Sequence, residues 1–216
     1  MQPRDDIRLG MLASGSGSSV QSLCDRIYAG GLDGFAPAVV LCNKAPGTAG
    51  IYARAERIGV PVLHAERPDD QLSLLDAYGA QMLLGLGHLK LVESSVLEHF
   101  GYRGGDSFAP LAWNIHPAVD LHRFGGKGMY GHHVHDAVIA AGEKESGATV
   151  HMMGERYDDP RGILQQVRVP VFPTDTPETL QQRVLQFEYP LMATTLAAFR
   201  DNLLPNCPNP WYVPDE

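Results

Sequence analysis

Asn114 and His116 lie two residues apart at the end of an apolar run, Leu111 to Pro117. Alternate residues of a strand face the same side, so these two side chains point one way and Ile115 points the other. Pro117 cannot donate a ladder hydrogen bond, which predicts that the strand stops there with the pair at its carboxyl end. An amide donor beside an imidazole suits a reaction that passes through an oxyanion and a proton transfer. The alternative is a buried strand end whose Asn and His only satisfy loop backbone groups.

Two adjacent carboxylates, Asp158 and Asp159, lie in the polar connection 155–162. Acidic residues beside proline and glycine commonly serve turns, which is one interpretation of this stretch. The other is a carboxylate that is brought over the sheet to orient or charge His116, as a third group does for a catalytic base.

The segment 14–19 consists only of serine and glycine and lies between an apolar strand and a helix. Such a loop lets backbone N–H groups approach an anion at the positive end of a helix dipole. It is a poor dinucleotide fingerprint, because Val20 takes the place of the third glycine, and it lacks the Gly-Lys-Ser/Thr of a P-loop. The sequence therefore predicts a phosphate site for a substrate other than a dinucleotide, or else a flexible turn.

Six histidines fall in the second half of the chain: His116, His122, His132, His133, His135 and His151. His133 and His135 could reach one metal ion from a strand, but a helix is expected there, and residues two apart on a helix diverge. No cysteine or glutamate lies nearby at the spacing of a zinc site. We therefore expect no catalytic metal, and a group of solvated or pocket-lining histidines.

Strand and helix patterns alternate along the chain, and these elements must position the candidate residues. Apolar runs predict strands at 7–13, 37–43, 60–64, 80–86, 111–116, 148–153 and 163–171. Helices are expected at 20–29, 50–58, 69–78 (with Asp69 as a cap), 94–100 and from about 132 to 141, after a loop at 117–131. A last helix begins at Thr176-Pro177 and is kinked or split by Pro190. This order predicts an α/β fold, an open, mostly parallel twisted sheet with helices on both faces, of the Rossmann-like kind.

The composition sets broader expectations. The 216 residues can bury the core of one domain, which we expect over 1–203, followed by an extended or disordered proline-rich tail over 204–216. A net charge of −8 argues against a nucleic-acid or anionic-membrane surface. No run reaches the length of a membrane span and the start has no apolar signal core, so a cytoplasmic location is expected. Cys24, Cys42 and Cys207 fit no disulfide framework and are expected to be reduced thiols.

Several of these stretches together carry a resemblance to one enzyme family. Residues 14–18 are similar to the S-G-x-G-S phosphate loop of the phosphoribosylglycinamide formyltransferases, and 87–92 to their G-F-M-R-I-L folate segment. Residues 114–117 match their N-I-H-P motif, which the wider formyltransferase superfamily shares, and Asp158 falls on their catalytic aspartate. The chain therefore resembles these folate-dependent enzymes of purine synthesis over roughly residues 7–200.

The resemblance implies transfer of a formyl group from N10-formyltetrahydrofolate, as co-substrate, to the primary amine of glycinamide ribonucleotide. The implied catalytic residues are Asn114, His116 and Asp158, with Asp158 keeping His116 charged and relaying a proton from the amine to N10. The implied substrate-phosphate site is Gly15, Ser16, Gly17, Ser18 and Ser19. The implied folate site is Lys90, Leu91, Val92, Tyr157 and Asp159. The expected partners are a phosphorylated amine and a reduced folate, without metal, nucleic acid or membrane, for a monomer or homodimer.

Four departures from the family pattern lie mainly on the amine side. Residues 158–162 replace a D-G-G-P turn, the loop 118–130 is longer, and a few residues are missing near Glu188. The segment between His64 and Ala80 is shorter and lacks the arginine that meets substrate phosphate. Three alternatives stay open: formyl transfer to another amine such as an amino sugar nucleotide, hydrolysis of formyltetrahydrofolate, and non-catalytic binding of folate or phosphate.

Overall fold

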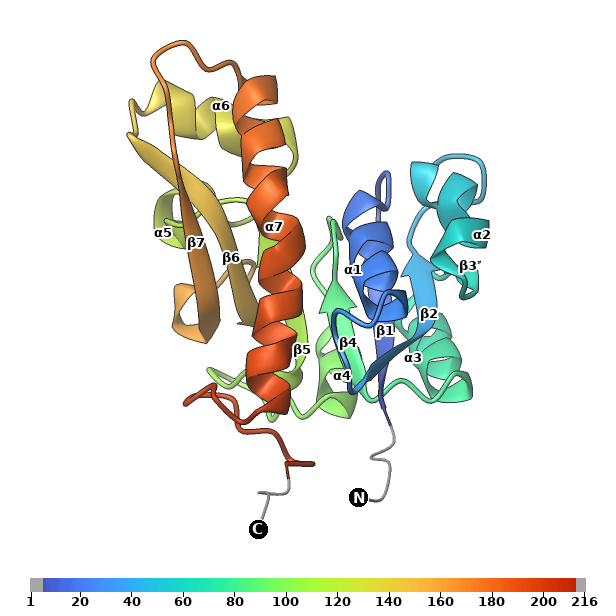
Figure 1. Cartoon of the computed structure of the whole chain (residues 1–216). Helices are drawn as coiled ribbons and strands as arrows, with labels where there is room; N and C mark the ends of the chain where they lie inside the picture. The colour runs from blue at the N-terminus through green and yellow to red at the C-terminus, as the bar shows by residue number, and fades with distance from the viewer. Residues whose placement is uncertain (1–5, 213–216) are drawn as a thin grey trace.

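A central sheet of seven strands runs through the molecule in the order β3-β2-β1-β4-β5-β6-β7, in a computed structural model that describes residues 6–212 (Figure 1). The strands are β1 (Ile7–Ala13), β2 (Phe35–Cys42), β3 (Val62–His64), β4 (Met82–Gly85), β5 (Ala109–His116), β6 (Glu145–Met153) and β7 (Ile163–Pro170). The first five are parallel, whereas β6 pairs antiparallel with both β5 and β7. The predicted open, mostly parallel sheet is confirmed.

Helices cover both faces of this sheet. They are α1 (Ser18–Tyr28), α2 (Ala55–Ile58), α3 (Pro68–Ala77), α4 (Ser94–His99), α5 (Leu121–Phe124), α6 (His132–Ala140) and α7 (Pro177–Arg200), with 3-10 turns η1 (Gly50–Arg54) and η2 (Pro160–Gly162). Helices α1, α6 and α7 share one hydrophobic core with the sheet, and α3 and α4 share the other. The layers are therefore helix, sheet and helix, as a parallel sheet buried on both faces requires.

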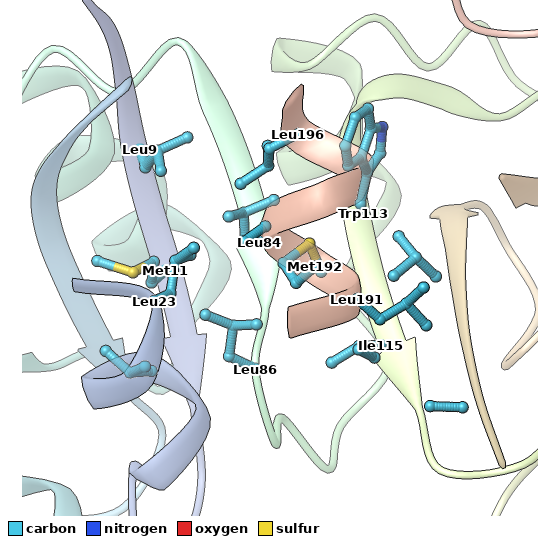
Figure 2. Close-up of a cluster of buried hydrophobic side chains, with 14 of the residues drawn as sticks. Leu9, Met11, Leu23, Leu84, Leu86, Trp113, Ile115, Leu191, Met192 and Leu196 are labelled. Atoms are coloured by element: carbon cyan, nitrogen blue, oxygen red, sulfur yellow. The ribbon is translucent and has the colours of Figure 1, made fainter. Parts of the chain in front are cut away.

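The larger core lies between the sheet and helix α7. Its side chains come from β1, β4, β5, α1 and α7 and include Leu9, Met11, Leu23, Leu84, Leu86, Leu191, Met192 and Leu196 (Figure 2). Trp113 of β5 is fully buried there and packs edge-on against Phe199, with 5.2 Å between ring centroids. Full burial of a leucine, isoleucine or methionine side chain in this core contributes about 1.5–3 kcal/mol to the free energy of unfolding. Because Trp113 and Ile115 face α7, Asn114 and His116 face the other side of the strand.

The helices predicted over 50–58 and 69–78 differ in detail from those in the structure. Arg67 and not Asp69 is the N-cap of α3, and Pro68 takes the first helical position, where its missing N–H costs nothing. Asp69 lies instead in the first turn, where its charge interacts favourably with the helix dipole. The helix predicted over 50–58 is divided into the 3-10 turn η1 and the single turn α2.

The predicted loop 117–131 contains the short helix α5. Its cap is Asp120, whose carboxylate accepts hydrogen bonds from the N–H groups of His122 (3.1 Å) and Arg123 (3.2 Å). An acidic cap of this kind satisfies helix donors that otherwise have no partner. The helix is one turn long, too short for a periodic apolar pattern to reveal it.

Helix α7 starts as predicted and then differs. Thr176 is its N-cap and forms a capping box with Thr179, and Pro177 lies in the first turn. Of the predicted kink or split at Pro190, the split is wrong, because the helix is continuous through Pro190. Residues on both sides of Pro190 are buried in the core, and their packing outweighs the roughly 3 kcal/mol that an interior proline costs.

The segment after Leu204 has no helix or strand up to Tyr212, yet part of it packs on the domain. Leu204 and Cys207 are buried, and the Cys207 thiol donates a hydrogen bond to the Pro110 carbonyl (3.1 Å). Residues 213–216 of the predicted tail lie outside the described residues, as do residues 1–5 of the predicted signal-free start. The cysteines are all buried and free, as expected. Within residues 6–212, no helix has the length and apolar character needed to cross a membrane.

Candidate active site

A cavity of about 350 Å³ opens beyond the carboxyl ends of β1, β4 and β5. The order of the strands reverses between β1 and β4, and ligands of open α/β sheets bind outside the strand ends at such a switch point. Loop 14–19 forms one wall, the segment 86–92 after β4 a second, and the connection 154–158 after β6 a third. The sequence elements singled out for chemistry therefore converge on one space.

The end of β5 brings Asn114 and His116 to the floor of this cavity, as their spacing predicts. Gly85 lies opposite Asn114 in the neighbouring strand β4. A Cβ atom on Gly85 would come within 2.5 Å of the Asn114 side-chain oxygen. The glycine therefore makes the room that the Asn114 amide occupies.

Asp158 is the centre of a buried polar network at this floor. Its Oδ1 lies 3.2 Å from Nε2 of His151 and accepts a long hydrogen bond from the Asn114 amide at 3.4 Å. Its Oδ2 lies 3.4 Å from Nδ1 of His116 and accepts a hydrogen bond from the Gly126 N–H at 2.9 Å. His116, His151 and Asp158 are each at most 7 % exposed. The structure thus brings Asn114 and His116 within hydrogen-bonding reach of Asp158, the third residue expected to be catalytic.

The backbone at Asp158 is strained in a way that aims this carboxylate inward. Its φ of 47° lies in the left-handed region, which aspartate tolerates better than most residues but which costs of order 1 kcal/mol. Gly125 lies directly against it, and a Cβ there would be 2.9 Å from the Asp158 Cβ. The close approach of the two segments needs a glycine at position 125.

Burial and charge oppose each other in this network. Burial acts to raise the pKa of Asp158, but the hydrogen bond from His151 and the charges of the two histidines hold that pKa below its usual value. Burial lowers the pKa of His116 and outweighs both the Asp158 charge and the Phe124 carbonyl, which lies 2.7 Å from Nε2. Desolvation is therefore the larger effect on His116 in the resting site, and the expectation that Asp158 keeps His116 charged stays a prediction. An imidazole of lowered pKa releases a proton readily.

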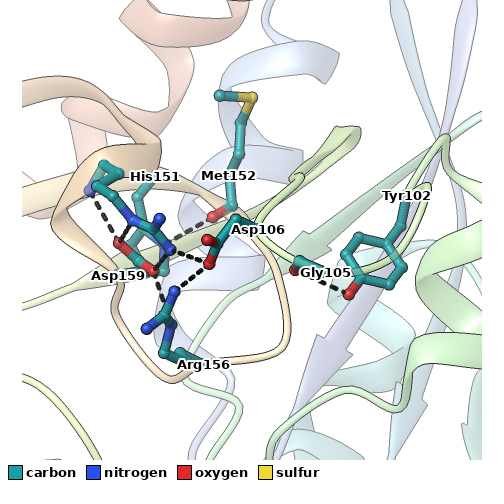
Figure 3. A network of polar contacts seen from close by, with 8 residues as sticks. Tyr102, Gly105, Asp106, His151, Met152, Arg156 and Asp159 are labelled. Atoms are coloured by element: carbon teal, nitrogen blue, oxygen red, sulfur yellow. Dashed lines mark hydrogen bonds and ion pairs between the residues drawn. The ribbon is translucent and has the colours of Figure 1, made fainter.

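His151 is a member of the network that sequence reasoning placed only among the pocket-lining histidines. It lies directly opposite Asn114 in the antiparallel pairing of β5 and β6, and its Nε2 is 3.3 Å from the Asn114 amide nitrogen. Its Nδ1 lies 3.1 Å from the Met152 carbonyl (Figure 3). This contact leaves Nε2 for Asp158. His135 of α6 also lines the cavity, and burial lowers its pKa to about 4. A histidine inside an apolar strand was the available signal for His151.

Loop 14–19 presents the start of helix α1 to the cavity. Gly17 is the N-cap with φ 76°, and a Cβ on it would lie 2.0 Å from the end of the Ile51 side chain. The Ile51 N–H donates to the Gly15 carbonyl (3.1 Å) and Arg54 Nε donates to the Ser16 carbonyl (2.9 Å), which fixes the loop. The N-cap Gly17 has no side chain to cap α1, and the Ser18 N–H makes only a long hydrogen bond to the Ser16 hydroxyl at 3.5 Å, so the first N–H groups are available to an anion. All five residues expected to bind phosphate line the cavity.

Glu188 of α7 reaches the same wall from the other side. It lines the cavity, and its Oε1 accepts a hydrogen bond from the Ser19 hydroxyl at 3.1 Å. Burial raises the pKa of Glu188 to about 7, so the carboxyl is partly protonated at neutral pH. This chain has a few residues fewer than the family pattern near Glu188, but the Glu188 side chain still reaches the cavity.

The second and third walls contain four of the five residues expected to bind folate, Lys90, Leu91, Val92 and Tyr157. The Tyr157 hydroxyl accepts a hydrogen bond from the Leu91 N–H at 2.8 Å, which ties the segment after β4 to the connection after β6. The Lys90 ammonium pairs with Glu66 at the surface (2.7 Å). This segment therefore offers the cavity mainly backbone groups and apolar side chains.

Asp159 is the exception, because it does not line the cavity. Its carboxylate accepts hydrogen bonds from the backbone and guanidinium of Arg161 and pairs with Arg156 (3.2 Å). Both arginines also pair with Asp106 (Figure 3). Asp159 thus caps the 3-10 turn η2, and Arg161, two residues on, is what turns the carboxylate away from the folate wall.

The formyl transferase family matches residues 7–196 of this chain. The chain belongs to this family. Among its relatives is the chloroplastic phosphoribosylglycinamide formyltransferase of Arabidopsis thaliana, 38 % identical over 88 % of this chain and 64 % of the relative. The phosphoribosylglycinamide formyltransferase of Haemophilus influenzae is 26 % identical over 91 % of this chain and 89 % of its own length.

A solved structure extends the likeness to three dimensions. The crystal structure of glycinamide ribonucleotide transformylase 1 from Symbiobacterium toebii matches this chain with a TM-score of 0.76 at 29 % identity, over 90 % of this chain and 87 % of that chain. The predicted family resemblance is confirmed. The chain spans 60–64 % of the length of the three chloroplastic plant relatives it matches.

Proposed function

We propose that this protein transfers a formyl group from N10-formyltetrahydrofolate to the primary amine of glycinamide ribonucleotide, a step of purine synthesis. The observation that carries the proposal is the Asp158 carboxylate, which joins Asn114 and His116 between a loop suited to phosphate and a wall suited to folate. The names of the relatives point to the same reaction.

In this proposal the amine attacks the formyl carbon and forms a tetrahedral oxyanion. The Asn114 amide and the His116 imidazole stabilise that oxyanion with hydrogen bonds. Nε2 of His116 is engaged by the Phe124 carbonyl, so this hydrogen bond is exchanged for the substrate oxygen on binding. The new C–N bond forms at the amine, and the bond from the formyl carbon to N10 breaks.

Asp158 supports both the position and the charge of His116. Its Oδ2 faces Nδ1, which orients the ring with Nε2 directed away from the carboxylate. A negative charge there favours the imidazolium when the oxyanion forms, although burial disfavours it in the resting site. The proton lost by the attacking amine passes through water and this network to the leaving N10.

The two substrates lie against different walls of the cavity. The ribose phosphate lies on the backbone of residues 15–19 at the positive end of α1, and Ser19 and Glu188 offer hydrogen bonds to the polar part of the amine substrate. The reduced folate lies along the backbone of 90–92 and Tyr157. The proposed partners are these two small molecules, with no metal in the chemical step and no nucleic acid or membrane, for a monomer or homodimer.

A cytoplasmic location is also part of the proposal. The plant relatives, in contrast, are named chloroplastic. A fluorescent fusion with the complete natural chain tests it, and signal confined to an organelle would contradict it.

One assay tests the reaction. The protein is incubated with 10-formyl folate and glycinamide ribonucleotide, and folate product is followed with and without the amine. We expect product only with the amine present. Product without any amine would identify a hydrolase, product only with an amino sugar nucleotide would identify a different transferase, and folate binding without turnover would identify a binding protein.

A further inference from the structure

We propose that His132, His133 and Asp136 form a binding site for a divalent transition metal ion of the zinc class at the start of helix α6. One nitrogen from each imidazole and one oxygen of the carboxylate all lie within 4.8 Å of one another. This site lies outside the catalytic network and does not depend on the proposed formyl transfer.

Helical spacing explains why each of the two histidines meets Asp136. His132 and His133 precede Asp136 by four and three residues, the separations at which side chains meet on a helix surface. The two imidazole rings are themselves 4.1 Å apart between centroids. His135, which the sequence paired with His133, is only 1 % exposed and lines the catalytic cavity instead.

The donor set selects the class of ion. Two imidazoles and a carboxylate suit zinc, nickel or copper, whereas magnesium and calcium take oxygen ligands. Three protein ligands with a water in the fourth position form a common tetrahedral arrangement for zinc. Bonds of about 2.0–2.2 Å place neighbouring donors about 3.4 Å apart, so each pair of donors must close by at most about 1.4 Å.

The three side chains are free to make that movement. All of them are exposed, and among residues 6–212 no hydrogen bond or ion pair engages any of them. Rotation about their side-chain torsions is therefore opposed only by rotamer preference and by the ring contacts of His133 with His132 and Tyr130. The net charge of −8 on the chain also favours the approach of a cation.

The site borders the wall of the catalytic cavity. The Tyr130 ring packs edge-on against His133 with 5.5 Å between centroids, and Tyr130 lines the cavity. An ion that fixes the His133 ring therefore restrains this neighbouring segment, which lies directly before α6. When the metal ion binds, we expect slower hydrogen exchange of the backbone amides of residues 130–134.

The experiment titrates ZnCl₂ into the full-length protein by calorimetry at pH 7.5, without substrates, and repeats the titration with Co²⁺ while visible absorption is recorded. We expect one ion per chain and the intense absorption bands of tetrahedral Co²⁺. His133→Ala and Asp136→Asn should each weaken zinc binding at least about tenfold. Binding should weaken at pH 5.5, because the imidazoles must be deprotonated to bind.

The matched control is His122→Ala, which removes another exposed histidine, on α5. We expect this variant to bind zinc as the unchanged protein does. Equal loss in His122→Ala, or unchanged affinity in both His133→Ala and Asp136→Asn, would show diffuse binding to surface histidines and overturn the proposal. Because all substituted residues are exposed, circular dichroism should show that each variant is folded. His132→Ala provides a third, independent test, and it should also weaken zinc binding.

Discussion

One end of the cavity is loop 14–19 and the other is the Asp158 network, and the two ends offer different kinds of chemical group. Loop 14–19 offers backbone groups, and its shape depends on Gly17 lying against Ile51. The Asp158 network offers side chains, and its function depends on where charge and protons lie. The first end should therefore tolerate changes of side-chain type but not an added Cβ at Gly17, whereas the second should tolerate small changes of shape but not of charge.

The largest expected effect is that of Asp158→Asn. The amide keeps the size of the side chain and most hydrogen bonds but removes the charge that favours protonated His116. General acid–base catalysis contributes roughly 10²- to 10⁴-fold in rate, so kcat should fall at least about a hundredfold while the affinity for folate analogues changes little. Steady-state kinetics and folate-analogue titration measure the two effects. No loss of kcat would exclude the proposed role of Asp158.

Glu188 lies at the end of the cavity formed by loop 14–19, and it adds to the backbone groups there a side chain that titrates. Burial raises its pKa to about 7, against 4.5 for the exposed group. Between these values the native state holds a proton that the unfolded chain has released, so stability falls as pH rises through this window. From pH 5 to pH 8, the free energy of unfolding should fall by about 1–3 kcal/mol more in the unchanged protein than in Glu188→Gln.

Urea unfolding of both proteins at the two pH values tests this expectation. In the Glu188→Gln variant the side-chain amide still offers an oxygen to the Ser19 hydroxyl, so the comparison isolates ionisation from the loss of that hydrogen bond. A parallel pH dependence in the two proteins would show that Glu188 ionises normally.

Gly17→Ala tests the backbone end directly. The added Cβ meets Ile51 at 2.0 Å and occupies a left-handed backbone, so loop 14–19 must shift. We expect the KM for the phosphorylated amine to rise about tenfold with folate affinity unchanged, since a helix-terminus anion site depends on N–H positions. The double variant Gly17→Ala with Ile51→Ala removes the clash, and it should recover part of the lost affinity. An amine KM that stays the same in folded Gly17→Ala would exclude phosphate at this loop.

The same comparison shows what the sequence could and could not reveal. The facing of Asn114 and His116 follows from the period of two in a strand, and the anion loop follows from small residues between a strand and a helix. Both signals are local. The contact between His151 and Asn114 depends on the register of β5 and β6, which no local pattern specifies. The continuity of α7 through Pro190 likewise depends on tertiary packing.

Asp158 and Asp159 show the limit of local inference most directly. They are adjacent, and both are 7 % exposed. One carboxylate faces two histidines and the other faces two arginines, because Arg161 folds back on the turn that follows. Composition alone could not assign the two roles, since both residues fit a turn equally well.

Asp159→Asn is therefore the smallest effect we expect and the matched control for Asp158→Asn. Asparagine still caps η2 by accepting the Arg161 N–H, so only the charge pairing with the arginines is lost. Arg161 and Arg156 are about half exposed or more, at 48 % and 62 %, which reduces the value of these pairs to about 1 kcal/mol or less. Urea unfolding should show this loss at low salt and a smaller one at 1 M salt, because salt screens exposed charges.

The kcat of Asp159→Asn should remain within about threefold of the unchanged protein, since the side chain lies outside the cavity. Equal losses of kcat in the two variants would mean that the conformation of the whole turn, and not the charge beside His116, controls the reaction.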